Sequence, residues 1–349
     1  MTTIRDVARI AGVSVATASR ALNGHLNVTD GVRTRVTDAA AQLNYIPHSG
    51  ARSLTRQRSD AIGVVLPDLF GEYFSELVRG IDRVAHQAGL QLLLSNMHGS
   101  AQGTATAIRA MRGRVDGLLI MPPESDPAYL VASLPPGLPT VLINFPAGTI
   151  DVPSVAIDNY TGARAMTEAL LSGGCRRIAH ISGPRDNRDA RERLRGFVDA
   201  MRECGGELTP LILPGDFTEE AGAEAARLII AGNVAVDAVF AANDMMAVGC
   251  LAVLREAGIN VPDDIAVAGF DDIPLARHTY PALSTVEVHI ADMGAAAMTL
   301  LLAQIQGDDR AVHNHLLQPA LIMRGTTSIN QNRTRQKTAN DRRVEREIS

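Results

Sequence analysis

Several segments of the chain place hydrogen-bonding side chains and aromatic rings directly after short apolar runs. These segments are 67–74, 158–159, 183–193, 243–244 and 270–272. Asp and Asn side chains form hydrogen bonds with hydroxyl groups, an arginine offers a fork of donors, and Phe and Tyr rings supply flat apolar walls. This combination predicts a binding site for a sugar or a nucleoside.

The apolar runs before these segments alternate with helical segments, which is typical of a parallel sheet built from strand–helix–strand units. Strands of a first lobe are expected at 61–66, 90–94, 117–121, 140–143 and 155–157, and strands of a second lobe at 177–181, 211–213, 238–242 and 265–269. Ligands of such sheets bind beyond the carboxyl ends of the strands. The polar segments should therefore meet in a cleft between the lobes.

The N-terminal segment has a helical pattern instead. Thr3 can cap a helix that begins at Ile4, Gly12 can end it, and Ser14 can cap a second helix. The inner faces are expected to hold Ile4, Val7, Ala8 and Ala11 in the first helix and Val15, Ala18 and Leu22 in the second. Residues 29–43 predict a third helix. Such a pair of helices fits a helix-turn-helix, which places its second helix in the major groove of DNA, or an ordinary helical hairpin.

Charge is distributed unevenly along the 349 residues, whose net charge is −5. Residues 1–58 contain eight Arg against three Asp, whereas residues 328–349 contain five Arg and one Lys against three acidic residues. The remainder is strongly acidic. A basic head on an acidic body is expected when only the head meets a polyanion such as DNA.

Three blocks of sequence in this order, IRDVARIAGVSVATASRALNG, LNYIP and ARSL, resemble the head of the LacI/GalR family of bacterial repressors. The resemblance extends to about residue 327. It implies an all-α helix-turn-helix head at 1–48, a hinge helix and linker at 49–60, and an α/β body at 61–327. The body would resemble periplasmic binding proteins, with two doubly wound parallel-sheet lobes.

The resemblance also divides the body. Lobe one is expected at about 61–158 and 291–318, and lobe two at about 162–287 and 320–327. A helix at 291–306 and a strand around 321–323 are expected to complete lobe one. Residues 328–349 lack apolar periodicity and are expected to form a disordered basic tail.

In the head, the resemblance assigns DNA contacts residue by residue. It implies base contacts for Val15, Ala16 and Arg20 and phosphate contacts for Thr17, Ser19 and Asn23. Leu54 would insert into the minor groove, which kinks DNA by apolar unstacking. Gly50 departs from the family, where a β-branched residue is common, and glycine costs about 1 kcal/mol inside a helix.

In the body, the resemblance assigns the effector contacts. These are Tyr73, Phe74, Asn187, Asp189, Arg193, Phe217, Asn243 and Asp271. Asp and Asn also favour helix caps and loop hydrogen bonds, which is the structural alternative for several of them. Tyr73–Phe74 and 215–217 are similar to the branch of cytidine and purine repressors. A sugar is favoured as effector on family frequency, and a nucleoside or purine is the alternative.

The expected function is a ligand-responsive transcriptional regulator, a repressor that binds a pseudo-palindromic operator on double-stranded DNA as a homodimer. An enzyme is disfavoured, because the sequence has no P-loop, nucleophile elbow or metal-spaced His/Cys cluster; no metal or cofactor is expected. A transport solute-binding protein would leave the head unexplained. No apolar run is long enough to span a bilayer, and an odd number of cysteines fits the cytoplasm.

Overall fold

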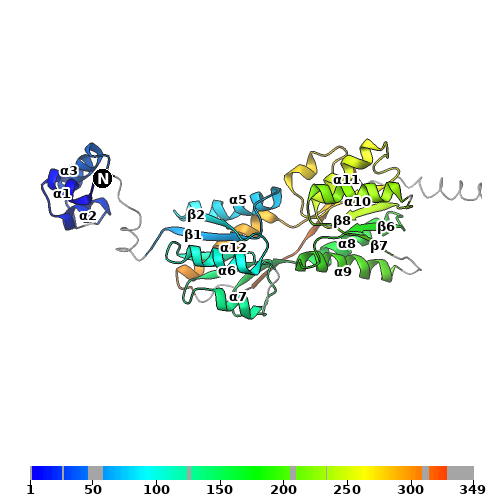
Figure 1. Cartoon of the computed structure of the whole chain (residues 1–349), viewed down its shortest axis with the longest axis horizontal. Helices are drawn as coiled ribbons and strands as arrows, with labels where there is room; N and C mark the ends of the chain where they lie inside the picture. The colour runs from blue at the N-terminus through cyan, green and yellow to red at the C-terminus, as the bar shows by residue number, and fades with distance from the viewer. Residues whose placement is uncertain are drawn as a thin grey trace, which may run out of the picture. The chain divides into compact units, whose positions relative to one another are not determined.

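A computed structural model of the chain describes residues 2–25, 27–45, 58–123, 127–204, 210–232, 234–308 and 314–327 (Figure 1). The chain divides into two compact units. One holds the residues up to Ala61 together with Gly113–Asp116, and the other holds the rest. Within the described ranges, no helix is both long enough and apolar enough to cross a membrane.

Three helices form the head: α1 (Ile4–Ala11), α2 (Val15–Leu22) and α3 (Asp30–Gln42). The Asp6 carboxylate accepts hydrogen bonds from the backbone N–H of Thr3 at 3.1 Å and from its hydroxyl at 2.8 Å. Gly12 ends α1 with a left-handed φ of 63°. The core is built largely from small side chains: Val7, Ala8, Ala11, Ala18, Ala21, Val28, Val36, Ala39 and Ala40. Small residues let three short helices pack closely.

One inner-face prediction in the head is wrong. Val15 is 44% exposed, whereas Ala21, three residues after Ala18, is buried. Val15 is the first residue of α2 and points to solvent, so the helix presents it on the face that was predicted to read bases. Leu22 packs partly against the core as expected.

Lobe one contains a six-stranded sheet with the order β11-β5-β4-β3-β1-β2. Its strands are β1 (Ala61–Leu66), β2 (Gln91–Asn96), β3 (Gly117–Ile120), β4 (Thr140–Ile143), β5 (Ser154–Ile157) and β11 (Asn314–Leu317). Its helices are α5 (Glu72–Gln87), α6 (Ala101–Met111), α7 (Pro127–Ser133) and α12 (Ile290–Ile305). Every residue of β1, β3 and β4 is buried, which explains their continuous apolar runs.

Helices α5 and α12 approach each other closely in this lobe (Figure 1). A Cβ atom added to Gly80 would lie 1.8 Å from the carbonyl oxygen of Ala291, and one added to Gly294 would lie 2.3 Å from the carbonyl oxygen of Leu77. Only glycine fits at either position, so these two residues set the spacing of the helices. These contacts fix α5 against α12 within lobe one.

Lobe two contains a four-stranded parallel sheet with the order β7-β6-β8-β9. Its strands are β6 (Ile178–Ile181), β7 (Leu211–Leu213), β8 (Ala238–Ala241) and β9 (Ala266–Ala268). Its helices are α8 (Asn159–Ser172), α9 (Arg188–Glu203), α10 (Glu219–Ala231) and α11 (Asp244–Glu256), followed by the short 3₁₀ helix η1 (Pro274–Arg277). The chain passes between the lobes three times, near 157–159, 287–290 and 317–320.

The strand predicted to complete lobe one is wrong, although α12 matches the predicted helix. Strand β11 pairs in parallel with β5 at the edge of the lobe-one sheet. Strand β12 (Ala320–Ile322) instead pairs antiparallel with β10 (Thr285–Glu287). Half of β11 is polar, Asn314 and His315, and most of the strand is exposed at the sheet edge. An edge strand lacks the apolar run by which the buried strands were found.

Candidate functional site

A cavity of about 470 Å³ opens beyond the carboxyl ends of the strands of both lobes. Lobe one contributes the segment after β1 and the residues after β2 and β3, and lobe two contributes the segments after β6, β7, β8 and β9. All eight residues predicted to contact an effector line this interlobe cavity: Tyr73, Phe74, Asn187, Asp189, Arg193, Phe217, Asn243 and Asp271. The structure therefore brings them together, and their contact with a ligand stays a prediction.

Arg193 on α9 is held by the protein on all three of its nitrogens. Its Nε donates a hydrogen bond to Asn159 at 2.8 Å, and its Nη1 donates to the carbonyl oxygen of Ala242 at 2.6 Å. Its Nη2 lies 3.1 Å from Oδ1 of Asp271. The guanidinium also stacks on the Phe270 ring, with Cζ 3.8 Å from the ring centroid. A guanidinium has five N–H groups; two of them donate to Asn159 and Ala242, while Nη2 faces Asp271 as an ion pair.

Asp271 is buried opposite Arg193, and its Oδ1 accepts no well-oriented hydrogen bond from any described residue. Burial raises the pKa of Asp271 to about 6, although the positive charge of Arg193 opposes the rise. Its backbone has a φ of 116°, a region that residues other than glycine rarely adopt. Such strain is concentrated at functional sites. A ligand hydroxyl could supply the hydrogen bond that Oδ1 lacks.

A chain of polar side chains continues from Arg193 toward lobe one. Asn159 accepts from Arg193 and donates to Oδ1 of Asp189 at 3.0 Å. Asn144 donates to the Tyr73 hydroxyl at 2.9 Å. Burial raises the pKa of both Asp189 and Tyr73. Asn144 and Asn159 were not among the predicted contacts, although Asn144 directly follows β4, Asn159 is the second residue after β5, and the segment 158–159 was singled out.

Two predicted contacts also act as helix caps. The side-chain oxygen of Asn187 accepts from Ala190 N–H at 2.9 Å at the start of α9. Asn243 accepts from Met246 N–H at 3.0 Å at the start of α11 and donates to the carbonyl oxygen of Phe217 at 2.9 Å. Asn243 therefore fixes Phe217, whose φ of 72° is also left-handed. Asn187 and Asn243 can cap a helix and also contact a ligand, because a side-chain amide has two N–H donors and an oxygen that accepts two hydrogen bonds.

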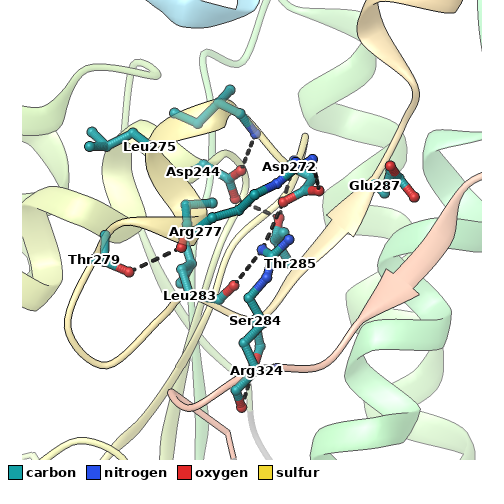
Figure 2. A network of polar contacts seen from close by, with 12 residues as sticks. Asp244, Asp272, Leu275, Arg277, Thr279, Leu283, Ser284, Thr285, Glu287 and Arg324 are labelled. Atoms are coloured by element: carbon teal, nitrogen blue, oxygen red, sulfur yellow. Dashed lines mark hydrogen bonds and ion pairs between the residues drawn. The ribbon is translucent and has the colours of Figure 1, made fainter.

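A polar network around the buried side chains of Asp244 and Asp272 fixes the segment after β9 (Figure 2). Arg277 and Arg324 approach the Asp272 carboxylate at 3.2 Å and 2.7 Å. The Asp244 carboxylate accepts hydrogen bonds from the Thr285 hydroxyl at 2.5 Å and from the backbone N–H of Ile273 at 2.9 Å. Burial raises the pKa of Asp244 well above its usual range. These contacts hold in place the chain segment that carries Asp271.

One hydrogen bond joins the lobes directly beside this network. The Glu72 carboxylate, at the start of α5 in lobe one, accepts from the backbone N–H of Leu275 in η1 at 2.8 Å. Leu275 belongs to the segment that follows Asp271. When one lobe moves against the other, this hydrogen bond must either lengthen or move together with the segment that holds Leu275.

In the head, α2 exposes the three residues predicted to read bases: Val15, Ala16 and Arg20. The three predicted phosphate contacts are half-buried: Thr17, Ser19 and Asn23. The Thr17 hydroxyl lies 2.8 Å from Ser14 Oγ, and Asn23 donates to Ser19 Oγ at 3.3 Å. Leu54 and Gly50 lie outside the described residues.

The end of the linker is fixed by one carboxylate. Asp116, directly before β3, accepts from the Ser59 backbone N–H and hydroxyl at 2.7 Å each and from the Asp60 N–H at 2.9 Å. Three hydrogen bonds to one carboxylate thus join Ser59 and Asp60 to the residue that precedes β3. Among the described residues, no group of His, Cys, Asp or Glu side chains is arranged to hold a metal ion.

Residues 3–48 match "Bacterial regulatory proteins, lacI family", and residues 167–327 match a "Periplasmic binding protein-like domain". A "Ribose operon repressor" of Halalkalibacterium halodurans is 34% identical and covers 95% of this chain and 99% of its own. The "HTH-type transcriptional repressor CytR" of Escherichia coli K12 is 36% identical, and the match covers 93% of this chain and 96% of the CytR chain.

Solved structures agree with these sequence relatives. The lac repressor dimer bound to operator and the anti-inducer ONPF has a TM-score of 0.83 and 29% identity, and covers 93% of this chain and 99% of its own. The CelR–cellobiose complex has a TM-score of 0.68 and 32% identity, and the match covers 93% of this chain and 100% of the CelR chain. The helical head and the two-lobed body are thus found together in these relatives, and the chain belongs to the lacI family of bacterial regulatory proteins.

Proposed function

We propose that the protein is a transcriptional repressor whose operator affinity is set by a sugar-containing effector in the interlobe cavity. One observation carries the proposal: residues from both lobes converge on a cavity in which the buried Oδ1 of Asp271 accepts no well-oriented hydrogen bond from a described residue and lies 3.1 Å from the guanidinium of Arg193. Hydroxyl groups both donate and accept, so a polyol matches this pair. The aromatic rings of Phe74 and Phe217 line the same cavity and suit the apolar faces of a ring.

The relatives support this assignment. One is named as a repressor of a ribose operon, and another regulator was solved with cellobiose bound. A nucleoside is the second candidate, because it adds a flat base that the same aromatic rings could stack against. Both candidates contain a sugar, and the pair formed by Arg193 and Asp271 would bind the sugar hydroxyls in either.

DNA binding is assigned to a homodimer. The lac repressor, which shares this fold, was solved as a dimer on its operator. Two copies of α2 related by a twofold axis would read the two halves of a pseudo-palindrome. An effector that bridges the lobes favours one arrangement of them, and operator DNA and effector then alter each other's affinity by the same factor.

A thermal-shift screen of pentoses, hexoses and nucleosides tests the effector site. We expect a stabilising compound for the wild type and loss of its shift in Arg193→Lys, which keeps the charge but loses the fork of donors. Arg202→Ala is the matched control, because Arg202 lies on the same helix with its side chain 74% exposed. An equal shift in Arg193→Lys would remove Arg193 from the site.

A further inference from the structure

Three arginines surround the point at which the linker enters the lobe-one sheet. Strands β1 and β3 are parallel neighbours in this sheet, and Ile62 lies opposite Gly117. Arg58 precedes β1, whereas Arg112 and Arg114 precede β3. Parallel strands run in the same direction, so the segments before β1 and β3 lie at the same edge of the sheet. We refer to Arg58, Arg112 and Arg114 as the basic edge.

Hydrogen bonds hold these two segments together. The Asp116 carboxylate accepts from the backbone N–H groups of Ser59 and Asp60. The backbone N–H of Asp116 donates to the carbonyl oxygen of Ala61 at 2.8 Å. The negative charge of Asp116 is therefore directed at the linker backbone. Asp60, which is exposed, carries the other carboxylate of residues 58–61 and 112–116, so positive charge exceeds negative charge at this edge.

The guanidinium groups of the basic edge are available to a ligand. All three side chains are exposed, and none of the described residues forms an ion pair or a hydrogen bond with them. Elsewhere on the body, exposed arginines such as Arg79, Arg227 and Arg277 each pair with a carboxylate. A guanidinium presents a planar fork of donors that matches the oxygens of a phosphate group. The basic edge therefore suits a phosphate-bearing polyanion.

The linker determines which polyanion this edge meets. Residues 46–57 join Tyr45 of the DNA-binding head to Arg58, and a fully extended chain of this length spans at most about 45 Å. DNA bound by the head is thus tethered near the basic edge, which raises the effective concentration of its phosphates there. The body as a whole is acidic and is repelled by DNA. A basic edge on an acidic body is the part that DNA attracts.

We propose that the basic edge is a second DNA contact, which binds phosphates of double-stranded DNA without reading their sequence while the head reads the operator. Each phosphate that an arginine neutralises releases counterions, so these contacts increase affinity for every sequence and make affinity more sensitive to salt. The inference goes beyond the proposed function, because it requires DNA binding by the head but no effector.

Titration of the full-length protein with DNA at several KCl concentrations tests the inference. One duplex holds an operator selected from random DNA, and the other has an unrelated sequence. Arg112→Gln/Arg114→Gln removes two charges, and Arg202→Gln/Arg255→Gln is the control with the same charge change at exposed positions of lobe two. We expect the first variant to weaken binding to both duplexes by at least about fivefold. The slope of log affinity against log KCl concentration should become shallower by at least about one.

A conservative variant checks that charge is responsible. Arg112→Lys/Arg114→Lys keeps both charges and should retain the salt slope of the wild type. An unchanged slope in Arg112→Gln/Arg114→Gln would overturn the inference, and so would an equal loss of affinity in the lobe-two control.

Directed cleavage locates the DNA. An iron–EDTA reagent is coupled to Ala110→Cys in a Cys204→Ser background, because Ala110 is an exposed residue of α6 and Cys175 and Cys250 are buried. Ala257→Cys, at an exposed position after α11, is the control. We expect cleavage of the bound operator duplex from position 110 and none from position 257. No cleavage from position 110, or equal cleavage from both, would overturn the inference. Failure of the wild type to bind any duplex would instead reject DNA binding itself, and this inference with it.

Discussion

Arg193 and Asp271 form an ion pair of 3.1 Å whose side chains are only 4% and 6% exposed. Each comes from a different element, α9 and the segment after β9. Removing one partner leaves a buried charge without compensation. The pair is therefore a structural contact of lobe two as well as the centre of the proposed effector site.

The first prediction concerns stability. Arg193→Ala should lower the free energy of unfolding by about 3–5 kcal/mol, because Asp271 then stays buried without its partner. Urea denaturation measures the change. The double variant Arg193→Ala/Asp271→Asn should recover part of the loss, since the uncompensated charge is gone. A single-variant loss below about 1 kcal/mol would show that Asp271 is hydrated in solution.

The second prediction concerns pH. Burial raises the pKa of Asp271 to about 6, above the value of about 3.9 for an unfolded aspartate. The folded protein thus binds a proton that the unfolded chain has released, and Asp271 stabilises the fold less as pH rises from about 4 to 6. An effector hydroxyl that donates to the carboxylate favours the ionised form. Effector affinity should therefore fall about tenfold from pH 8 to pH 5.

Calorimetry across this pH range checks the expectation, with Asp271→Asn as the comparison. The nearby groups are Arg193 and Asp189, and burial also raises the pKa of Asp189. A steep profile that persists unchanged in Asp271→Asn would assign the titration to Asp189 instead.

The third prediction concerns base readout by α2. Arg20→Ala should relax operator preference at one base pair per half-site by about 1–3 kcal/mol. Binding to operators with single base-pair changes measures this, and Arg35→Ala, an exposed arginine on α3, is the control. Uniform weakening on every sequence would make Arg20 a phosphate contact.

The fourth prediction concerns the junction between linker and body. Asp116→Ala removes three hydrogen bonds to Ser59 and Asp60, whereas Ser59→Ala removes only the one from its hydroxyl. We expect both variants to bind effector as the wild type does. The ratio of operator affinities with and without effector should fall toward one in Asp116→Ala and change less in Ser59→Ala. An unchanged ratio in Asp116→Ala would show that coupling does not depend on this contact.

Local signals in the sequence were sufficient to predict most elements. Thr3, Gly12 and Ser14 mark the ends of α1 and the start of α2, because caps depend on short-range hydrogen bonds and backbone conformation. Strands β4 and β7 have the predicted bounds. Strand β11 was missed because, at the sheet edge, it is half polar, and its pairing with β5 depends on contacts distant in sequence.

The cleft was predicted less completely than the fold. Residues that follow strands could be identified, because parallel strands bring their carboxyl ends to one edge. Asn159 accepts a hydrogen bond from Arg193 and donates one to Asp189. These contacts depend on where α9 places Arg193 in the cleft, and no local sequence pattern predicts that position.

Operator binding with and without effector tests the central claim most directly. An operator selected from random DNA would be titrated with the wild type and with Arg193→Lys, and fluorescence anisotropy would be recorded with and without the compound that binds the cleft. We predict at least a tenfold change in the operator affinity of the wild type. Arg193→Lys should bind the operator equally well alone but respond less than twofold. An operator affinity of the wild type that stays constant at saturating compound would contradict the account.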